Sequence, residues 1–402
     1  MAKKTINNID VSDKTVLMRV DFNVPLDGKT VTNDKRIVAA LPSINKVLDA
    51  GGKLVLMSHL GRPKGEVTDE FSLKPAADKL AEHLGKEVKL GPASPIAGDE
   101  AKQMAADLSA GEVLCLENVR FDPREDSKDE SDVLAFGAEL GELGEVYVND
   151  AFGTCHRKHA SMWGAPQAIQ KKGGPAVAGM LVEKEIKYLH EAVADPKRPF
   201  LAILGGAKVS DKIKLIATLL DKVDRIIIGG AMAYTLLKAR GVKVGKSRVE
   251  EDQVDEMKSI LDKAGDTIVL PEDHVGAGEF ESDEAKTTDG VEIPDDMMGL
   301  DIGPRTIETF KGIIAESKTI VWNGPMGVFE RDAYAAGTKA VAQAVADATD
   351  AGAISVIGGG DSATAVEEFG LEDNMTHVST GGGASLTYLE GKPMPPIEVL
   401  DD

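Results

Sequence analysis

Four stretches in the second half of the chain decide the fold: FLAILGGAKVSDK (200–212), RIIIGGAMAYTLL (225–237), ISVIGGGDSATA (354–365) and HVSTGGGASL (377–386). In each, an apolar strand-like run ends in a glycine-rich turn. Helix-like segments follow, and this order predicts βαβ units around a parallel sheet. Glycine turns that open helices present N–H groups and positive dipole ends, which suit phosphate groups.

Strand-like runs in the first half end differently. These runs lead into Asp, Asn, His and Arg: VLMRVDFN (16–23), KLVLMSHLGRP (53–63), EVLCLENVRF (112–121) and EVYVNDAFGTCHR (145–157). Ligands of parallel α/β sheets sit beyond the carboxyl ends of the strands, and the arginine fork grips phosphate or carboxylate. The pattern therefore predicts two sites, one for a polyphosphate and one for a small anion.

The length of 402 residues indicates about two to three domains. A helix is expected at 33–53, with polar residues at its start, Gly51 at its end and a kink at Pro42. Breaks are expected at 171–175 and 195–199. Residues 176–194 have helical apolar spacing and could connect two domains.

Composition excludes several classes of protein. The net charge is −21, from 46 basic and 67 acidic residues, which argues against binding of duplex nucleic acid and fits a solvated acidic surface. Cys115 and Cys155 have no metal-ligand spacing and are expected to be reduced thiols. The start MAKKTINNID has no signal-peptide pattern, and no run approaches the roughly 18 apolar residues of a membrane span. A soluble, intracellular protein is expected.

Two lysines stand out after the first glycine turn. Lys208 and Lys212 are expected near the N-terminus of a helix that begins near Ser210. A lysine there opposes the helix dipole, so a bound anion would compensate it. The plainer interpretation is a solvated lysine at a turn.

Asp361 follows three glycines and precedes Ser362. A carboxylate at this place could hold Mg²⁺ beside a nucleotide phosphate. The alternative is an ordinary helix N-cap.

Polar and basic residues follow the strands of the first half. Asp21 and Asn23 are expected on one side of a strand end, and Arg36 in the first turn of a helix, where a cation is disfavoured. Any one arginine is more often in a surface salt bridge than in a ligand site, but their shared position favours a site. The other members of the set are His59, Arg62, Arg120 and Arg157.

Two weaker motifs are rejected. Residues 358–363 match G-x-G-x-x-A, but the next strand-like run, HVST, ends with no acid to hold a ribose. GVKVGKS (241–247) has one residue too few between its glycines for a Walker A loop and does not follow a strand. No G-x-S-x-G elbow and no His/Cys zinc cluster is present in the sequence. Two other classes of protein are considered as alternatives to an enzyme with a polyphosphate site and a small-anion site. They are a two-domain NAD-dependent oxidoreductase and a non-enzymatic nucleotide-binding module.

Eight motifs together resemble those of the phosphoglycerate kinase family, in the family's order and over nearly the whole chain. They are RVDFNVP (19–25), SHLGRP (58–63), ENVRF (117–121), NDAFGTCHRKHAS (149–161), LGGAKVSDKI (204–213), NGPMGVFE (323–330), GGGDSATA (358–365) and STGGGASL (379–386).

The resemblance implies an α/β fold of two doubly wound, Rossmann-like parallel-sheet domains joined by a helix. The expected parts are a 3-phosphoglycerate-binding domain (1–172), a linker and helix (173–195), a nucleotide-binding domain (196–385) and a tail packing on the first domain (386–402). Residues matching the family's 3-phosphoglycerate ligands are Asp21, Asn23, Arg36, His59, Arg62, Arg120 and Arg157.

The second domain would hold MgATP. Lys208 and Lys212 match phosphate contacts, Asp361 matches the metal-associated acid, and Glu330 would hold the ribose. The rest of the expected nucleotide pocket is Gly205, Gly229, Gly230, Asn323, Pro325, Gly358, Gly359, Gly360 and Ser362. Cys155 and Ser362 depart modestly from the family pattern, as they stand where Ala and Thr are usual. Residues 271–280 also differ and are assigned no role.

The implied reaction is reversible phosphoryl transfer between ATP and 3-phosphoglycerate, giving ADP and 1,3-bisphosphoglycerate, in glycolysis and gluconeogenesis. Because the acceptor is already an oxyanion, no general base is required, and catalysis is expected to be positioning plus charge neutralisation. Groups expected around the transferring phosphoryl are Arg36, Lys208, Gly381, Gly382 and Gly383. A cytoplasmic monomer that closes its domains, with Mg²⁺ as cofactor and no nucleic-acid or membrane partner, is expected.

Overall fold

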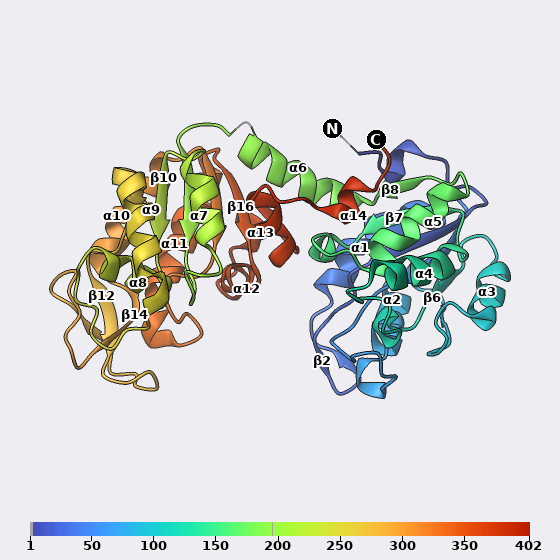
Figure 1. Cartoon of the computed structure of the whole chain (residues 1–402), viewed down its shortest axis with the longest axis horizontal. Coiled ribbons are helices and arrows are strands. Elements are labelled where there is room, and N and C mark those ends of the chain that lie inside the picture. Colours follow the sequence, from blue (N-terminus) through green and yellow to red (C-terminus); the bar gives the residue numbers. More distant parts are fainter. Residues whose placement is uncertain (1–2, 195) are drawn as a thin grey trace. The chain divides into compact units, whose positions relative to one another are not determined.

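The computed structural model describes residues 3–194 and 196–402 (Figure 1). Contacts divide the chain into two compact units, Met1–Ile186 with Pro393–Asp402, and Lys187–Lys392. The division falls within helix α6, Met180–Ala194. Within the described ranges, no helix is long and apolar enough to cross a membrane.

The first unit is built on a six-stranded parallel sheet in the order β5-β6-β4-β1-β7-β8. Central strands β1, β4 and β7 are buried almost throughout, as strands covered on both faces must be. The chain moves outward from β1 to β4 and later returns to β7 on the other side of β1, so the strand order reverses between β1 and β7. The strands are β1 Thr15–Val20, β4 Lys53–Met57, β5 Val88–Leu90, β6 Val113–Cys115, β7 Val146–Asp150 and β8 Ala176–Ala178.

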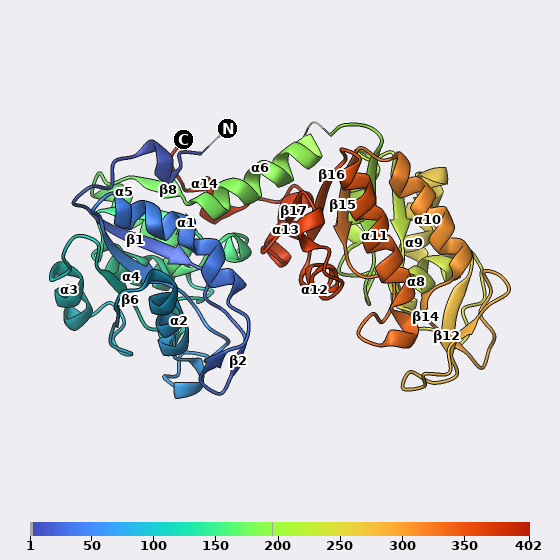
Figure 2. The same cartoon turned by 180° about the vertical axis from the view of Figure 1, so that it is seen from behind.

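Helices cover both faces of this sheet. Helices α1 and α2 lie on one face, and α4 and α5 on the other (Figure 1, Figure 2). Val16, Met18 and Val20 of β1 pack with the apolar stripe of α1 in one buried cluster. The helices are α1 Lys35–Asp49, α2 Lys74–Leu84, α3 Asp99–Ala106, α4 Glu130–Gly141 and α5 Ala165–Lys171, and a short hairpin pairs β2 Leu26–Asp27 with β3 Thr30–Val31.

Both ends of the chain belong to this unit. The N–H of Lys4 donates to the carbonyl of Asp401 at 2.9 Å, and the N–H of Asp401 donates to Ala176 of β8 at 2.8 Å. Helix α14, Pro395–Glu398, lies in the returning segment. The predicted return of the tail to the first domain is therefore confirmed for Pro393–Asp402, whereas the preceding residues of the expected tail, from 386 to 392, belong to the second unit.

The second unit holds another six-stranded parallel sheet, in the order β11-β10-β9-β15-β16-β17. The chain runs outward from β9 through β10 to β11 and then restarts at β15 on the other side of β9. This is the strand order of dinucleotide-binding folds, whose ligands sit where the order reverses. The strands are β9 Phe200–Leu204, β10 Arg225–Ile228, β11 Ile268–Val269, β15 Thr319–Asn323, β16 Ile354–Gly358 and β17 His377–Val378.

Helices again cover both faces. Helices α7, α8 and α9 lie on one face and α10 and α11 on the other (Figure 1, Figure 2). Phe310 and Ile314 of α10 pack with Trp322 of β15 and Val341 of α11. The helices are α7 Ile213–Leu220, α8 Met232–Ala239, α9 Val254–Ala264, α10 Pro304–Glu316, α11 Ala336–Asp350, α12 Gly360–Glu368 and α13 Gly383–Leu389. A small antiparallel sheet joins β12 His274–Ala277 to β13 Lys286–Thr287 and β14 Met298–Ile302.

The α/β class with two doubly wound parallel sheets is confirmed, and some details differ from expectation. Helix α1 continues through the exposed Pro42, and the kink expected there stays a prediction. Residues 176–178 form β8 and pair with β7, so the helix expected at 176–194 begins only at Met180. The expected break at 171–175 is a turn between α5 and β8. The break at 195–199 begins at residue 195, which lies outside the described residues.

Candidate functional site

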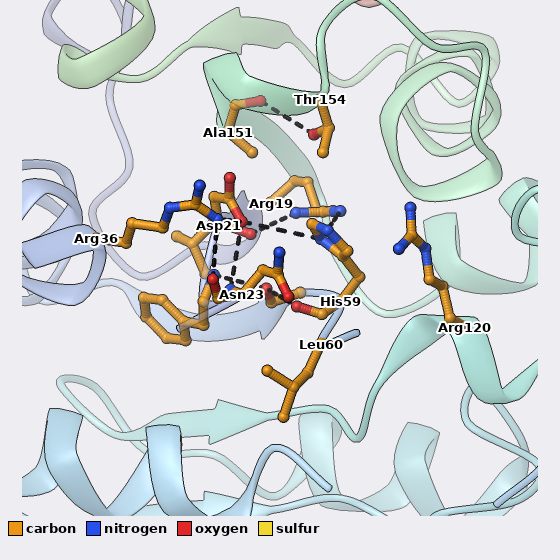
Figure 3. A network of polar contacts seen from close by, with 12 residues as sticks. Arg19, Asp21, Asn23, Arg36, His59, Leu60, Arg120, Ala151 and Thr154 are labelled. Carbon is orange, nitrogen blue, oxygen red and sulfur yellow. Dashed lines mark hydrogen bonds and ion pairs between the residues drawn. The ribbon is translucent and has the colours of Figure 1, made fainter. Parts of the chain in front are cut away.

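Asp21 and Asn23 follow directly on β1, at the edge of the first sheet where the strand order reverses (Figure 3). Asp21 is buried and Asn23 half-buried. The N–H of Asn23 donates to Asp21 Oδ1 at 3.3 Å, and Asn23 Oδ1 accepts the N–H of Gly61 at 2.9 Å. The amide side chain of Asn23 thereby ties the loop after β1 to the loop after β4.

Arg36 is the second residue of α1, as predicted. Its Nη1 donates to the carbonyl of Asn23 at 2.9 Å and lies 3.4 Å from Asp21 Oδ1. Asp21 thus offsets a cation that the helix dipole disfavours. The guanidinium remains over a third exposed, so it keeps free donors for an anion.

His59 follows β4 and is buried beside Asp21. Arg19 Nη2 donates to His59 Nδ1 at 3.1 Å, so Nε2 carries the proton of the neutral ring. Burial, and then the charges of Arg19 and Arg120, hold the pKa of His59 well below its usual value. His59 is therefore a neutral donor at pH 7.

The other arginines differ in exposure. Arg120 is buried just after β6, where its Nη1 donates to Gly61 O at 2.6 Å, and its Nε has no partner among the described residues. In Figure 3, Arg120 lies on the far side of His59 from Arg36. Arg157 is half-buried and donates through Nε to His156 Nε2 at 2.9 Å, whereas Arg62 is exposed. Arg36, His59 and Arg120 thus gather in one region, with Arg62 and Arg157 on loops that follow neighbouring strands.

Sequence reasoning missed Arg19 and Glu125. Arg19 lies fully buried inside β1 and donates to the carbonyl of Val20 and, through Nε, to Ser161 Oγ at 3.0 Å. Glu125 is also fully buried and accepts the Oγ and N–H of Ser161 at 2.6 and 2.9 Å. For Arg19, the available signal was its position within the apolar run VLMRV. A charge in a buried strand must be paired, so this arginine indicates a polar cluster nearby. The signal for Glu125 is weaker, as its run is polar throughout.

Burial controls the ionisation of this cluster. It raises the pKa of Glu125 to about 6, against the opposing effects of Arg19 and Ser161. It lowers the pKa of His159 to about 3 and that of His156 to about 4, with the neighbouring arginines acting in the same direction. The histidines are therefore neutral and the arginines carry the positive charge, which suits a small, multiply charged anion.

The second unit brings glycines together at the end of β9. The N–H of Gly205 donates to Asn323 O at 3.0 Å, and that of Gly206 to Pro325 O at 2.9 Å. A Cβ on Gly205 would lie 2.1 Å from Pro325 O. Only glycine allows the loops after β9 and β15 to approach so closely.

Gly229 and Gly230 follow β10 beside the same loop. The N–H of Gly230 donates to Met326 O at 2.8 Å, and its φ is +66°, a region that favours glycine. A Cβ on Gly229 would lie 2.6 Å from Met326 Sδ. Three of the predicted nucleotide-binding loops thus meet where the strand order reverses.

Lys208 and Lys212 have different surroundings. The predicted helix start near Ser210 is wrong: α7 begins at Ile213, because Val209 and Ser210 are held in a turn by Glu250. Lys212 is the buried N-cap residue, and its Nζ donates to Gly205 O. Burial lowers the pKa of Lys212 to about 8, while Asp361 and Asp211 oppose this effect. Lys208 is exposed in the loop, outside the first turn of α7.

Asp361 is the second residue of α12 and is exposed. The N-cap is Gly359, with φ +90°, so the capping alternative for Asp361 is wrong. Ser362 is buried and accepts the N–H of Gly324 at 2.5 Å. Asn323 Nδ2 is buried without a partner among the described residues and lies close to Gly359, which leaves a donor for a ligand.

The remaining predicted nucleotide residues follow β15 and β17. Glu330 is exposed in the turn after β15. Gly381 and Gly382 precede α13, and Gly383 is its first residue. The N–H of Gly381 donates to Ser379 Oγ at 3.0 Å, which fixes the start of this turn.

Asp361 is the acid that fits a magnesium ion carried by nucleotide phosphates. In the described parts of the chain, no group of three or more His, Cys, Asp or Glu side chains could hold a metal by itself. Mg²⁺ commonly needs only one or two protein carboxylates when phosphates supply other ligands. The exposed Asp361 beside a glycine turn meets that requirement.

Comparisons with known proteins agree with this geometry. A family model described as phosphoglycerate kinase matches residues 6–392. The phosphoglycerate kinases of Prosthecochloris aestuarii and Chloroherpeton thalassium are each 55% identical, over 407 and 408 residues, and the alignments cover 100% of both chains. The solved phosphoglycerate kinase of Coxiella burnetii has a TM-score of 0.86 at 39% identity, covering 99% of this chain and 98% of that one. That of Pyrococcus horikoshii has a TM-score of 0.85 at 32% identity, covering 98% and 97%. The chain therefore belongs to the phosphoglycerate kinase family.

Proposed function

We propose that the chain transfers a phosphoryl group reversibly between ATP and 3-phosphoglycerate, as a kinase of glycolysis and gluconeogenesis. The observation that carries this proposal is the family match over residues 6–392. The structure supports it with a cationic cluster at the reversal point of one sheet and glycine loops at that of the other. An oxidoreductase is less well supported, because no acid follows β17 at Ser379 to hold a ribose.

The first unit would bind 3-phosphoglycerate. Exposed and half-buried guanidinium groups of Arg36, Arg62 and Arg157 are free to grip its phosphate or carboxylate. Neutral His59 would donate a hydrogen bond through Nε2, and the unpaired Nε of Arg120 would find an acceptor. Asp21 and Asn23 would orient these groups and meet the hydroxyl of the substrate.

The second unit would bind the nucleotide. Gly205, Gly229 and Gly230 leave room for a ligand close to the backbone, and Asn323 Nδ2 offers a buried donor. Pro325, Glu330 and Gly358–Ser362 complete the proposed pocket, with Glu330 at the ribose. Lys208 and Lys212 would contact phosphates, and Asp361 would hold Mg²⁺, which supplies charge neutralisation to the nucleotide oxygens when bound.

Transfer would occur in line, without a general base, since the attacking group is already an oxyanion. Lys208, Arg36 and the glycine turn 381–383 would stabilise charge on the transferring group. Because the two clusters belong to separate units, this arrangement requires the units to close on each other. The proposed functional domains are a 3-phosphoglycerate-binding domain (1–172), a linker and helix (173–195), a nucleotide-binding domain (196–385) and a tail (386–402).

The protein is further proposed to act as a cytoplasmic monomer that binds neither nucleic acid nor membranes. Two buried free cysteines, Cys115 and Cys155, fit a reducing compartment. The net charge of −21 supports the absence of a nucleic-acid partner.

A coupled assay for 3-phosphoglycerate-dependent ATP turnover tests the reaction. Titration calorimetry with ATP, NAD and 3-phosphoglycerate separates the alternatives. Binding of NAD without turnover would favour an oxidoreductase. Binding of ATP alone would favour a nucleotide-binding module.

A further inference from the structure

Glu250 makes three contacts with the loop that carries Lys208. Its Oε2 accepts the N–H of Val209 at 2.6 Å and that of Ser210 at 3.1 Å. Its Oε1 accepts the hydroxyl of Ser210 at 2.6 Å. Both carboxylate oxygens are therefore engaged with two adjacent residues, next to Lys208.

The backbone of Glu250 is anchored to α8. The N–H of Glu250 donates at 3.1 Å to Thr235 Oγ1, and Thr235 is buried on α8. The first turn of α8 also binds the start of the loop, because the N–H of Met232 donates to Gly206 O at 3.0 Å. Helix α8 thus supports the loop at two places, directly at Gly206 and through Glu250 at Val209 and Ser210.

The loop depends on these supports because its middle is exposed. Ala207 and Lys208 are exposed, between Gly206 and the buried Val209. The next turn is closed by the N–H of Lys212, which donates to Val209 O at 2.8 Å. Lys208 is therefore flanked by fixed residues on both sides, although its own side chain is free to reach a ligand.

The negative charge of Glu250 strengthens its hydrogen bonds to the loop. Desolvation acts to raise the pKa of Glu250, but the hydrogen bonds from Ser210 and Val209 outweigh it, so the pKa is lowered. The ionised carboxylate occupies the N–H groups of Val209 and Ser210, which are then unavailable to a phosphate. Charge-assisted hydrogen bonds of this kind are stronger and shorter than neutral ones.

We infer that Glu250 is a positioning residue that fixes the β9–α7 loop so that Lys208 meets the nucleotide phosphates in a single geometry. The inference rests on the proposed function. Loss of the three contacts leaves the Lys208 charge in place but lets its backbone move, and misplacement by about 1 Å can cost 10²-fold in rate.

Glu250→Ala is expected to lower kcat about 10- to 100-fold while the KM for 3-phosphoglycerate stays within about twofold of wild type. Glu250→Gln retains an acceptor for the two N–H groups and should restore kcat to within about threefold of wild type. The matched control is Glu251→Ala, an exposed neighbour paired with Lys238 at 2.5 Å, which should leave kcat unchanged.

A double variant separates positioning from a purely structural effect. If Glu250 acts through Lys208, Glu250→Ala adds no more than about twofold to the loss caused by Lys208→Ala. Multiplicative losses in the double variant would overturn the inference. Hydrogen exchange of the Val209 and Ser210 amides should speed up about 10-fold or more in Glu250→Ala, and unchanged exchange would also overturn it.

Two further measurements keep the test decisive. Ser210→Ala removes one contact from an exposed residue, and should lower kcat about two- to fivefold even if Glu250→Ala does not fold; full activity in Ser210→Ala would count against the inference. An inactive wild type would refute the proposed function, whereas an active wild type with an unaffected Glu250→Ala would refute only the positioning role.

Discussion

Lys208 and Lys212 follow the same strand, and the side chain of Lys208 is the exposed one of the two. Lys212 is buried, and its Nζ already donates to Gly205 O. We therefore expect Lys208→Ala to lower kcat more than it weakens ATP binding. Removal of one preorganised charge contact typically costs about 10²–10³ in rate. Steady-state kinetics and ATP calorimetry on the folded variant provide the check, and an unchanged kcat would rule out a catalytic role for Lys208.

A variant of Arg62 tests whether a positive charge alone is enough to bind 3-phosphoglycerate in the first unit. Arg62→Lys keeps the charge but loses the planar fork that matches a phosphate, so the KM for 3-phosphoglycerate should rise about 10-fold or more. The control is Arg225→Lys, since Arg225 is exposed and is the first residue of β10 in the second unit, away from the carboxyl ends of the strands. A wild-type KM in Arg62→Lys would show that Arg62 is not a bidentate ligand.

Asp361 should govern the response to magnesium. Asp361→Asn keeps the side-chain shape and removes one charge, so half-maximal activity should need about 10-fold more Mg²⁺. The exposed Glu368 at the end of the same helix offers Glu368→Gln as a control. If the two variants give the same magnesium titration as wild type, Asp361 contributes nothing to metal binding.

Predictions for single residues succeeded where local sequence determines the structure. They failed where contacts with distant residues determine a helix start or the burial of a side chain. Arg36 was placed correctly in a first helical turn, since the polar start of α1 is local information. The helix after β9 was placed three residues too early, because Glu250, 40 residues away, holds Val209 and Ser210. The burial of Glu125 was also not predicted, since its partner Ser161 lies 36 residues away and is in turn held by Arg19.

At the scale of elements, glycine turns after apolar runs were a reliable guide. All four apolar runs that end in glycine turns in the second half form strands β9, β10, β16 and β17, each followed by a helix. Their order in the sheet could not be predicted, because strand pairing depends on packing of both faces rather than on any single segment. The short strand β8 was mistaken for helix since its three residues, Ala176–Ala178, are too few to show a period.

Asp301 links two elements of the second unit and gives a stability prediction. This buried acid of β14 accepts the N–H groups of Gly337 of α11 and of Ile302, at 2.7 and 2.9 Å. Burial nevertheless raises the pKa of Asp301 to about 7, from 3.8. Because the pKa is higher in the folded state, protonated Asp301 contributes to the free energy of unfolding. This contribution is complete below pH 3.8 and is lost as pH rises through about 7.

Asp301→Asn cannot ionise and should therefore escape this loss. Between pH 5 and pH 8, the free energy of unfolding of wild type should fall relative to that of Asp301→Asn, by at most about 3 kcal/mol. Denaturant unfolding of both proteins across this range measures the difference. A difference that is independent of pH would show that Asp301 does not titrate in this window.

For the molecule as a whole, the division of cationic residues and glycine turns between the two units supports the proposed function. The cationic cluster around Arg36, His59 and Arg120 belongs to the first unit, and the glycine loops around Gly205 and Asn323 to the second. The sequence predicted this division because each half has its own type of strand end. The unit boundary falls within the residues 176–194 that were expected to connect two domains, but its exact position inside the continuous helix α6 has no mark in the composition.

Phosphoryl transfer needs the reacting atoms about 3–3.5 Å apart in a site shielded from water. Each unit supplies only half of the proposed contacts, so closure should require both ligands. The expected hinge segments are 171–199, of which residue 195 lies outside the described residues, and the region of Ser379 and Thr380. Small-angle scattering should therefore give a smaller radius of gyration with 3-phosphoglycerate and a nonreactive MgATP analogue together than with either alone. An equal radius in all four states, measured on active protein at saturating ligand, would refute closure and require a site that is complete before the ligands bind.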